Sequence, residues 1–237
     1  MRNLTRDSDP FAIRDKIVRI YLRKILRRFR QLNQNLLVFD EINSMNAVYT
    51  AYDEVVEMSV EALKQIAKQT YRWICDDDFP MDMWLAETTG LSRSEIIDRM
   101  LSGTMDSFVA EFLQQADPVT HYKFYDEADR KRSRLFEAIE SVRTSGERKK
   151  QIEVGMRYWV KQFEQTADNL VDDVVLQAYR DNGVKYVMWM IMNDAKVCND
   201  CYRRKGKIYP IDSPLLRALH WNCRCWWIPI RKNVFKK

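Results

Sequence analysis

The stretch of sequence that decides the fold lies close to the C-terminus. It reads Cys198-Asn199-Asp200-Cys201 and, after eighteen intervening residues, His220-Trp221-Asn222-Cys223-Arg224-Cys225. Four of the five cysteines and one of the two histidines of the chain lie in this stretch. Two cysteines separated by two residues bind one ion on a tight turn, and a histidine with a following cysteine completes a tetrahedron. The residue types and their spacing therefore predict a closed Zn²⁺ site.

The second half of this stretch offers more ligands than the site needs. With Cys198 and Cys201 in place, a tetrahedral site requires two further ligands, whereas His220, Cys223 and Cys225 supply three. Cys223 is the predicted ligand because His220 and Cys223 repeat the two-residue gap of the first pair. Cys225 is the alternative, because Cys223 and Cys225 are two residues apart and face the same side of an extended chain. Buried or disulfide-bonded thiols are the competing interpretation. A site with four protein ligands has no open position for a substrate, so the predicted zinc is structural.

Several motifs around these cysteines resemble the C-terminal signature of a known family. They are Asp194 in the turn before the first cysteine pair, the step Gly206-Lys207-Ile208-Tyr209-Pro210, and His220-x-Asn222-Cys223-Arg224-Cys225. In this combination the segment resembles the phage Mu F-like minor head proteins, also called phage head morphogenesis proteins. The resemblance covers roughly residues 147–230. Trp221 stands where the family usually has proline, and residues 211–219 lack the usual proline-rich filler, but neither departure removes a predicted ligand.

The resemblance implies a minor component of a tailed-phage head with a structural and assembly role near the portal. It implies portal and capsid proteins as partners, contact with packaged DNA, synthesis in the host cytoplasm, and a final location in the virion, in the capsid interior or at the portal vertex. No catalytic function is expected, because the sequence has no glycine-rich phosphate loop and no recognisable nucleophile–base pairing. The alternative is a host zinc-ribbon module that binds nucleic acid. Few basic residues and no aromatic stacking pattern between Cys201 and His220 weigh against this alternative.

Composition favours long helices joined by short connections. The chain of 237 residues is 46% hydrophobic and has only six glycines and six prolines. Its net charge of +5 is mildly basic and does not by itself specify a nucleic-acid partner. No apolar run is long enough to span a bilayer, so no membrane partner is expected. The N-terminus lacks the apolar core of a secretory signal, and an odd number of cysteines is typical of a reducing compartment.

The turn Thr144-Ser145-Gly146 predicts a boundary between a helical N-terminal region, residues 1–146, and a C-terminal domain, residues 147–237. Apolar residues recur at helical spacing throughout the first region. The expected helices begin at Asp9-Pro10, run from Asp40 to about Cys75, follow the capping box Ser92-x-x-Glu95, and run from Asp117-Pro118 to about Val142. Acidic residues on the second helix are expected to pack beside the basic first helix.

One face of the first helix carries a row of basic residues. They follow the same rhythm as the apolar face but lie about 200° away from it, and they are Lys16, Arg19, Arg23, Arg27 and Arg30. One interpretation is the solvated face of a core helix. The other is a stripe that binds DNA phosphates or an acidic partner surface through Arg19, Arg23, Arg27 and Arg30. The absence of interleaved aromatic residues favours the solvated face.

The C-terminal domain is predicted to pair one long helix with a small antiparallel sheet. The helix spans Glu147–Asp181 and ends at Asn182-Gly183. The strand candidates are 184–192, 207–209 and 225–230, and Pro229 places the last one at an edge or ends its pairing. Trp226 and Trp227 point to opposite faces, so one is core and the other is either core or a docking anchor. The predicted class is α+β, predominantly helical, with a zinc knuckle beside the sheet.

Overall fold

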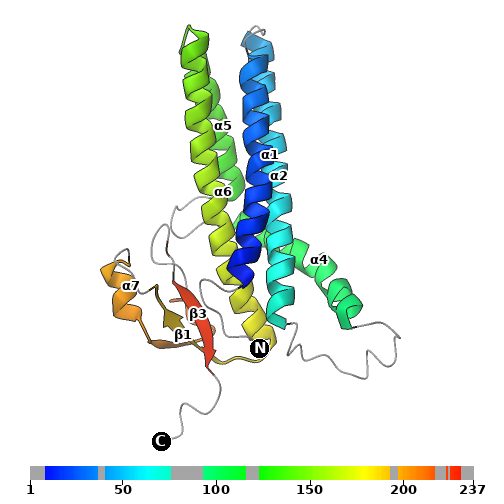
Figure 1. Cartoon of the computed structure of the whole chain (residues 1–237), viewed down its shortest axis with the longest axis vertical. Coiled ribbons are helices and arrows are strands. Elements are labelled where there is room, and N and C mark those ends of the chain that lie inside the picture. Colours follow the sequence, from blue (N-terminus) through cyan, green and yellow to red (C-terminus); the bar gives the residue numbers. More distant parts are fainter. Residues whose placement is uncertain are drawn as a thin grey trace, which may run out of the picture.

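A computed structural model describes residues 9–36, 41–75, 93–115, 123–192, 197–216, 223 and 225–230 of the chain. Four long helices lie side by side as a bundle (Figure 1): α1 (Asp9–Asn35), α2 (Glu41–Cys75), α5 (Phe124–Glu140) and α6 (Ser145–Asp181). A further helix, α4 (Arg93–Gln114), packs on α2 and α5 and extends away from the bundle. The predicted predominantly helical architecture is confirmed.

Aromatic side chains hold the centre of the bundle together. The Tyr52 ring of α2 lies edge-on to Phe29 of α1 and to Trp159 of α6, with centroids 5.5 and 5.8 Å apart. Such pairs add about 0.5–1.5 kcal/mol to the burial of the rings themselves. The indole N–H of Trp159 donates to Ser59 Oγ at 3.2 Å, and Ser59 donates to the Val55 carbonyl at 2.8 Å. The buried indole N–H of Trp159 and the buried hydroxyl of Ser59 are therefore both hydrogen-bonded.

Ion pairs join the first helix to its two neighbours. The guanidinium of Arg28 makes a two-point contact with the Glu54 carboxylate of α2. Arg14 Nη1 lies 2.8 Å from an oxygen of Asp168 on α6. The expected packing of the acidic second helix beside the basic first helix is confirmed, and the paired arginines are those that point into the helix interfaces.

One expected helix start differs from the structure, and another agrees with it. Helix α5 begins at Phe124, with Lys123 at its N-cap in an extended conformation (φ −72°, ψ 148°), so one helix running from Asp117 is wrong. Asp117 and Pro118 lie outside the described residues. Tertiary packing sets the observed start, because the buried Phe124 ring lies 5.4 Å from the Trp159 ring. Ser92 of the predicted capping box also lies outside the described residues, but α4 begins at Arg93, the residue at which a helix capped by Ser92 is expected to begin.

The turn predicted as a domain boundary is the start of α6. Thr144 is the N-cap: its side chain accepts from the Glu147 N–H at 3.2 Å, and Glu147 accepts from the Thr144 N–H at 3.2 Å, which completes a capping box. From this end α6 packs along α1, α2 and α5, and it also contacts β3 (Trp226–Ile230). Because α6 packs against helices of the N-terminal region and also against the sheet, the division at residue 147 stays a prediction.

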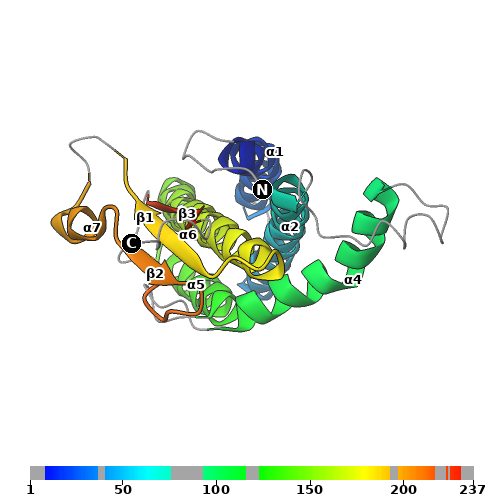
Figure 2. The same ribbon diagram turned by 90° about the horizontal axis from the view of Figure 1, so that it is seen from below.

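A three-stranded antiparallel sheet lies against α6 (Figure 2). Its strand order is β2 (Ile208–Pro210), β1 (Tyr186–Met190), β3, which confirms the three predicted strands. Strands β1 and β3 are shorter than predicted, and β2 is shifted by one residue. Pro229 lies on an edge strand opposite Val187, as predicted. Trp226 and Trp227 are both buried, 8% and 3% exposed, so neither is a docking anchor.

Hydrogen bonds at the end of α6 fix the sheet to the helix. The Tyr179 hydroxyl donates to the Trp227 carbonyl at 3.4 Å, and Arg180 donates to the Ile211 carbonyl at 3.4 Å. Gly183 then turns the chain into β1 with φ +70°, a conformation that favours glycine. Within the described ranges no helix is long and apolar enough to cross a bilayer.

Candidate metal centre

The first cysteine pair is organised by a short helix, α7 (Asn199–Arg204). Cys198 is the N-cap of α7, and its Sγ accepts from the Cys201 N–H at 3.4 Å. The side chain of an N-cap residue normally accepts from an N–H of the first turn, and here a sulfur takes that role. The two cysteines of the pair are thus fixed on one helical turn, with Cys201 buried and Cys198 half-buried.

Three cysteines from both halves of the signature converge. The sulfurs of Cys201, Cys223 and Cys225 all lie within 4.8 Å of one another, and the side chains are buried. Cys201 Sγ and Cys223 Sγ are 3.6 Å apart. Tetrahedral zinc with Zn–S bonds of about 2.3 Å places its sulfurs about 3.8 Å apart, whereas a disulfide needs about 2.05 Å. The spacing therefore suits thiolates around one metal ion, and the cysteines are free thiols.

Without a cation these thiols resist ionisation. Burial, followed by the charge of nearby Cys223, raises the pKa of Cys201 to about 12. The pKa of Cys225 is also raised, first by its hydrogen bond with Cys223 and then by burial. A divalent metal ion reverses this preference, because coordinated thiols lose their protons. When such an ion binds, the deprotonated cysteines supply several thiolate ligands within one small volume, and thiolates are ligands that favour Zn²⁺.

Three of the five predicted ligand residues lie together in the structure. Cys201 and Cys223 lie together, and Cys225 lies with them, so the structure does not choose between the last two. Cys198 is next to this group through its hydrogen bond to the Cys201 N–H. His220 lies outside the described residues. The identity of the metal and the complete ligand set stay predictions.

A cavity of about 480 Å³ borders the cysteine cluster. Its wall includes Cys223 and Cys225, the indole rings of Trp189 and Trp227, and the α6 carboxylates of Asp172 and Asp173. Sequence reasoning missed this cavity, because α4, α6 and the sheet each supply part of its lining. No local spacing predicts such a convergence.

The basic residues singled out on the first helix lie on its outer side. Arg19, Arg23, Arg27 and Arg30 are all exposed. The structure thus places these four arginines in one solvent-facing row, as the periodicity predicted. It does not distinguish a solvated face from a binding stripe.

The fifth cysteine has a separate, structural place. Cys75 is buried at the end of α2, where the Asn182 side chain donates to its sulfur at 3.4 Å. Cys75 is thus a small core residue.

Comparison of the chain with protein-family models, curated proteins and solved structures gives no match. The resemblance of the C-terminal segment therefore rests on the motifs quoted from the sequence.

Proposed function

We propose that this chain is a minor head protein of a tailed phage with a structural and assembly role near the portal. The observation that carries the proposal is the convergence of the signature cysteines: Cys201 and Cys223 are distant in sequence, yet their sulfurs lie 3.6 Å apart. This convergence is what the closed metal site of the resembled signature requires. The small sheet beside this cluster gives the segment the form of one compact unit.

Structural Zn²⁺ is the proposed cofactor of this unit. Cys201 would hold the ion together with Cys223 or Cys225, and Cys198 and His220 are the two further ligands predicted from the sequence. When bound, the ion supplies folding free energy and keeps the thiols deprotonated. No catalytic role is proposed.

The proposed partners are the portal and capsid proteins, in the capsid interior or at the portal vertex, after synthesis in the host cytoplasm. The helical bundle offers long exposed faces for such contacts. The exposed row Arg19, Arg23, Arg27 and Arg30 suits DNA phosphates or an acidic partner surface by charge. The proposal includes contact with packaged DNA through this row.

The test is a pull-down of the tagged full chain from the cells that produce the particle. Lysates are treated with nuclease, so that proteins linked only through DNA are lost, and the retained partners are identified by mass spectrometry. We expect portal and capsid proteins in excess over the bait. A bait with Cys201→Ser and Cys223→Ser tests whether the cysteine unit is needed, and Cys75→Ser is the matched control.

Two outcomes would overturn the proposal. Capture of nucleic-acid enzymes without portal or capsid proteins would favour the host zinc-ribbon module instead. Capture of nothing above the empty-tag control would mean that the resemblance reflects ancestry alone.

A further inference from the structure

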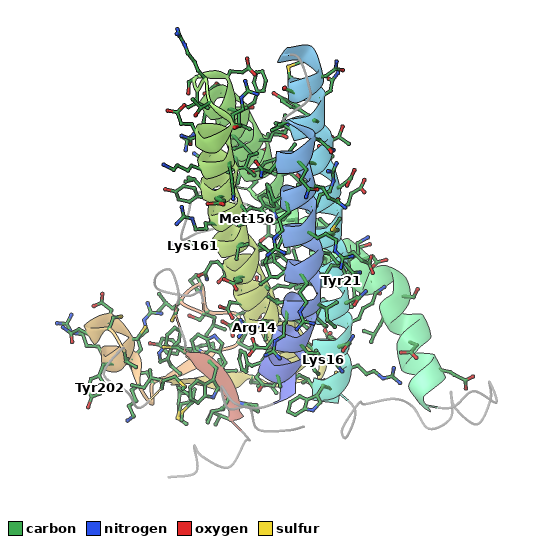
Figure 3. All side chains as sticks on the ribbon, turned by 45° about the horizontal axis from the view of Figure 1, so that its top comes forward. Arg14, Lys16, Tyr21, Met156, Lys161 and Tyr202 are labelled. Atoms are coloured by element: carbon green, nitrogen blue, oxygen red, sulfur yellow. The ribbon has the colours of Figure 1, made fainter. Side chains whose placement is uncertain are left out.

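The outer surface of α7 combines one exposed aromatic ring with a group of cations. Tyr202 is 63% exposed, more than any other large hydrophobic side chain among the described residues. Arg203, Lys205 and Lys207 are exposed beside it, and we call these four residues the α7 patch. Helix α7 lies at the edge of the molecule, away from the bundle (Figures 1 and 2), and Tyr202 points outward from it (Figure 3).

The α7 patch is strongly positive for its size. Between Asn199 and Lys207 the chain has four basic residues and one acidic residue, Asp200. Asp200 lies 3.6 Å from Arg203, but both side chains are more than 70% exposed, so solvent weakens this pair. The Lys205 ammonium lies over the Tyr202 ring, 5.9 Å from its centroid. One cation thus lies over the ring of a tyrosine that is 63% exposed, and two further exposed cations lie within five residues of it in the sequence.

Internal contacts hold the α7 patch in place. Cys201, the residue before Tyr202, is buried in the cysteine cluster. Arg204 donates to the Leu215 carbonyl at 2.9 Å, and its guanidinium lies 5.4 Å from the centroid of the Trp189 ring. Gly206, with φ +73°, donates from its N–H to the Trp189 carbonyl at 2.9 Å. The backbone beneath the patch is therefore tied to β1, so little conformational freedom is lost when a ligand binds.

We propose that the α7 patch binds single-stranded nucleic acid. In this arrangement a base stacks on the Tyr202 ring, and Arg203, Lys205 and Lys207 contact the phosphates on either side. Stacking on an aromatic side chain tolerates any base, and cations that neutralise phosphates release counterions from the strand. The two kinds of group on this surface match the two kinds of group in an unpaired strand.

Other anionic partners use only part of this surface. A duplex keeps its bases stacked inside, so it contacts the cations but leaves Tyr202 without a role. An acidic peptide likewise pairs with the cations through its carboxylates and offers no nucleobase to stack on the ring. The inference is independent of the proposed head function, because it rests on α7 alone and its test requires no phage protein.

The test measures binding of the purified full chain to a fluorescein-labelled oligothymidylate of about twelve nucleotides, within the range of single-strand site sizes. Fluorescence anisotropy is recorded over a series of salt concentrations. We expect Tyr202→Ala to weaken binding about tenfold, because base–aromatic stacking is lost. Tyr202→Phe keeps the ring, so its affinity should stay close to that of the unchanged chain.

A second variant and a matched control separate stacking from charge. Replacing Arg203, Lys205 and Lys207 with Gln should lower the dependence of log K on log salt by about 2, at about 0.7 per phosphate contact. Tyr158→Ala is the matched control, because Tyr158 is 58% exposed and has the Lys131 ammonium 5.4 Å from its centroid, but lies on α6. This control should leave binding unchanged.

Three outcomes would overturn the inference. These are equal affinity of Tyr202→Ala and the unchanged chain, tighter binding to a duplex of the same length than to the single strand, and no binding at low salt. Because Tyr202 is exposed, its substitution leaves the core intact, and an unchanged melting temperature confirms that each variant is folded. A failed pull-down with portal and capsid proteins would leave this result unaffected.

Discussion

The helical bundle and the C-terminal sheet are stabilised in different ways. The bundle buries long apolar faces from four helices, with Phe29, Tyr52 and Trp159 at its centre. The sheet has strands of only five, three and five residues, and its cysteines are buried next to it. A sheet this small needs a buried hydrophobic face or a helix to pack against in order to be stable. It depends on its contacts with α6 and, as we propose, on a metal ion, whereas the bundle depends on the hydrophobic effect.

The largest expected effect follows removal of the metal, and it should be confined to the sheet. Structural zinc contributes on the order of 10 kcal/mol to the folding of small zinc domains. We expect a strong chelator, or Cys201→Ser with Cys223→Ser, to abolish zinc binding and shift the tryptophan fluorescence toward that of exposed indole. Helical circular dichroism should change little. Metal analysis by atomic absorption and the two spectra check this prediction.

The matched control for the metal prediction is Cys75→Ser, since Cys75 is buried away from the cluster. It should keep full zinc content. A doubly substituted protein that retains the melting temperature of the unchanged chain would show that the sheet does not rely on the ion.

The next effect concerns the centre of the bundle. Trp159 is fully buried and contacts the rings of Tyr52 and Phe124. Trp159→Ala should lower the free energy of unfolding by about 3–5 kcal/mol, because it leaves a cavity and removes the hydrogen bond to Ser59. Chemical denaturation followed by circular dichroism measures the change. The adjacent exposed Tyr158→Ala should cost less than about 0.5 kcal/mol, and similar costs for the two would contradict the burial argument.

A smaller effect is expected at the outer face of α1. Arg23→Glu with Arg27→Glu should weaken retention of duplex DNA at low salt about tenfold if the exposed row binds phosphates, and should lower the salt slope by about 2. Filter binding over a salt series measures both quantities. Arg134→Glu with Arg143→Glu changes the same charge beside α5 and should have little effect. Unchanged retention in the α1 variant would identify the row as a solvated face.

The smallest effect is expected at the start of α6. Thr144→Ala removes an N-cap and should lower the melting temperature by about 2–4 °C. Hydrogen bonds from the Thr144 side chain, and then from its backbone, lower the pKa of Glu147. A lowered carboxyl pKa contributes stability above the usual value near 4.5, and that stability is lost as the pH falls through the lowered value. Thermal melts of Glu147→Gln and of the unchanged chain are compared at pH 7 and below pH 4. The variant should melt at a lower temperature at pH 7, and the two melting temperatures should become equal below pH 4.

The sequence predicted best those parts of the fold that repeat. Apolar residues at helical spacing fixed α1, α2 and α6, and β-branched and aromatic runs indicated the strands. The α5 start could not be read from Asp117-Pro118, because the packing of Phe124 on Trp159 sets it. Cap residues mark where a helix can begin, but long-range contacts decide where it does begin.

The sequence likewise predicted one part of the candidate site and not another. The ligand types and spacing of Cys201 and Cys223 predicted their convergence, because metal chemistry restricts both. The exposure of Tyr202 was not evident, since nothing in the local pattern showed that Cys201 would turn inward and leave its neighbour outside. The sequence of this region indicates no aromatic stacking pattern, because one tyrosine among basic residues is no pattern. Exposure is a property of the whole fold, so single residues of this kind appear only in the structure.

Helix α6 gives the molecule a mechanical property. Its 37 residues span about 55 Å without a break, from the cap at Thr144 to the hydrogen bonds that hold the sheet. A continuous helix bends only gently, so it works as a strut rather than a hinge. A load applied at α7 is therefore transmitted along α6 to the far end of the bundle. A partner that fixes the orientation of the sheet therefore also fixes the orientation of the far end of the bundle.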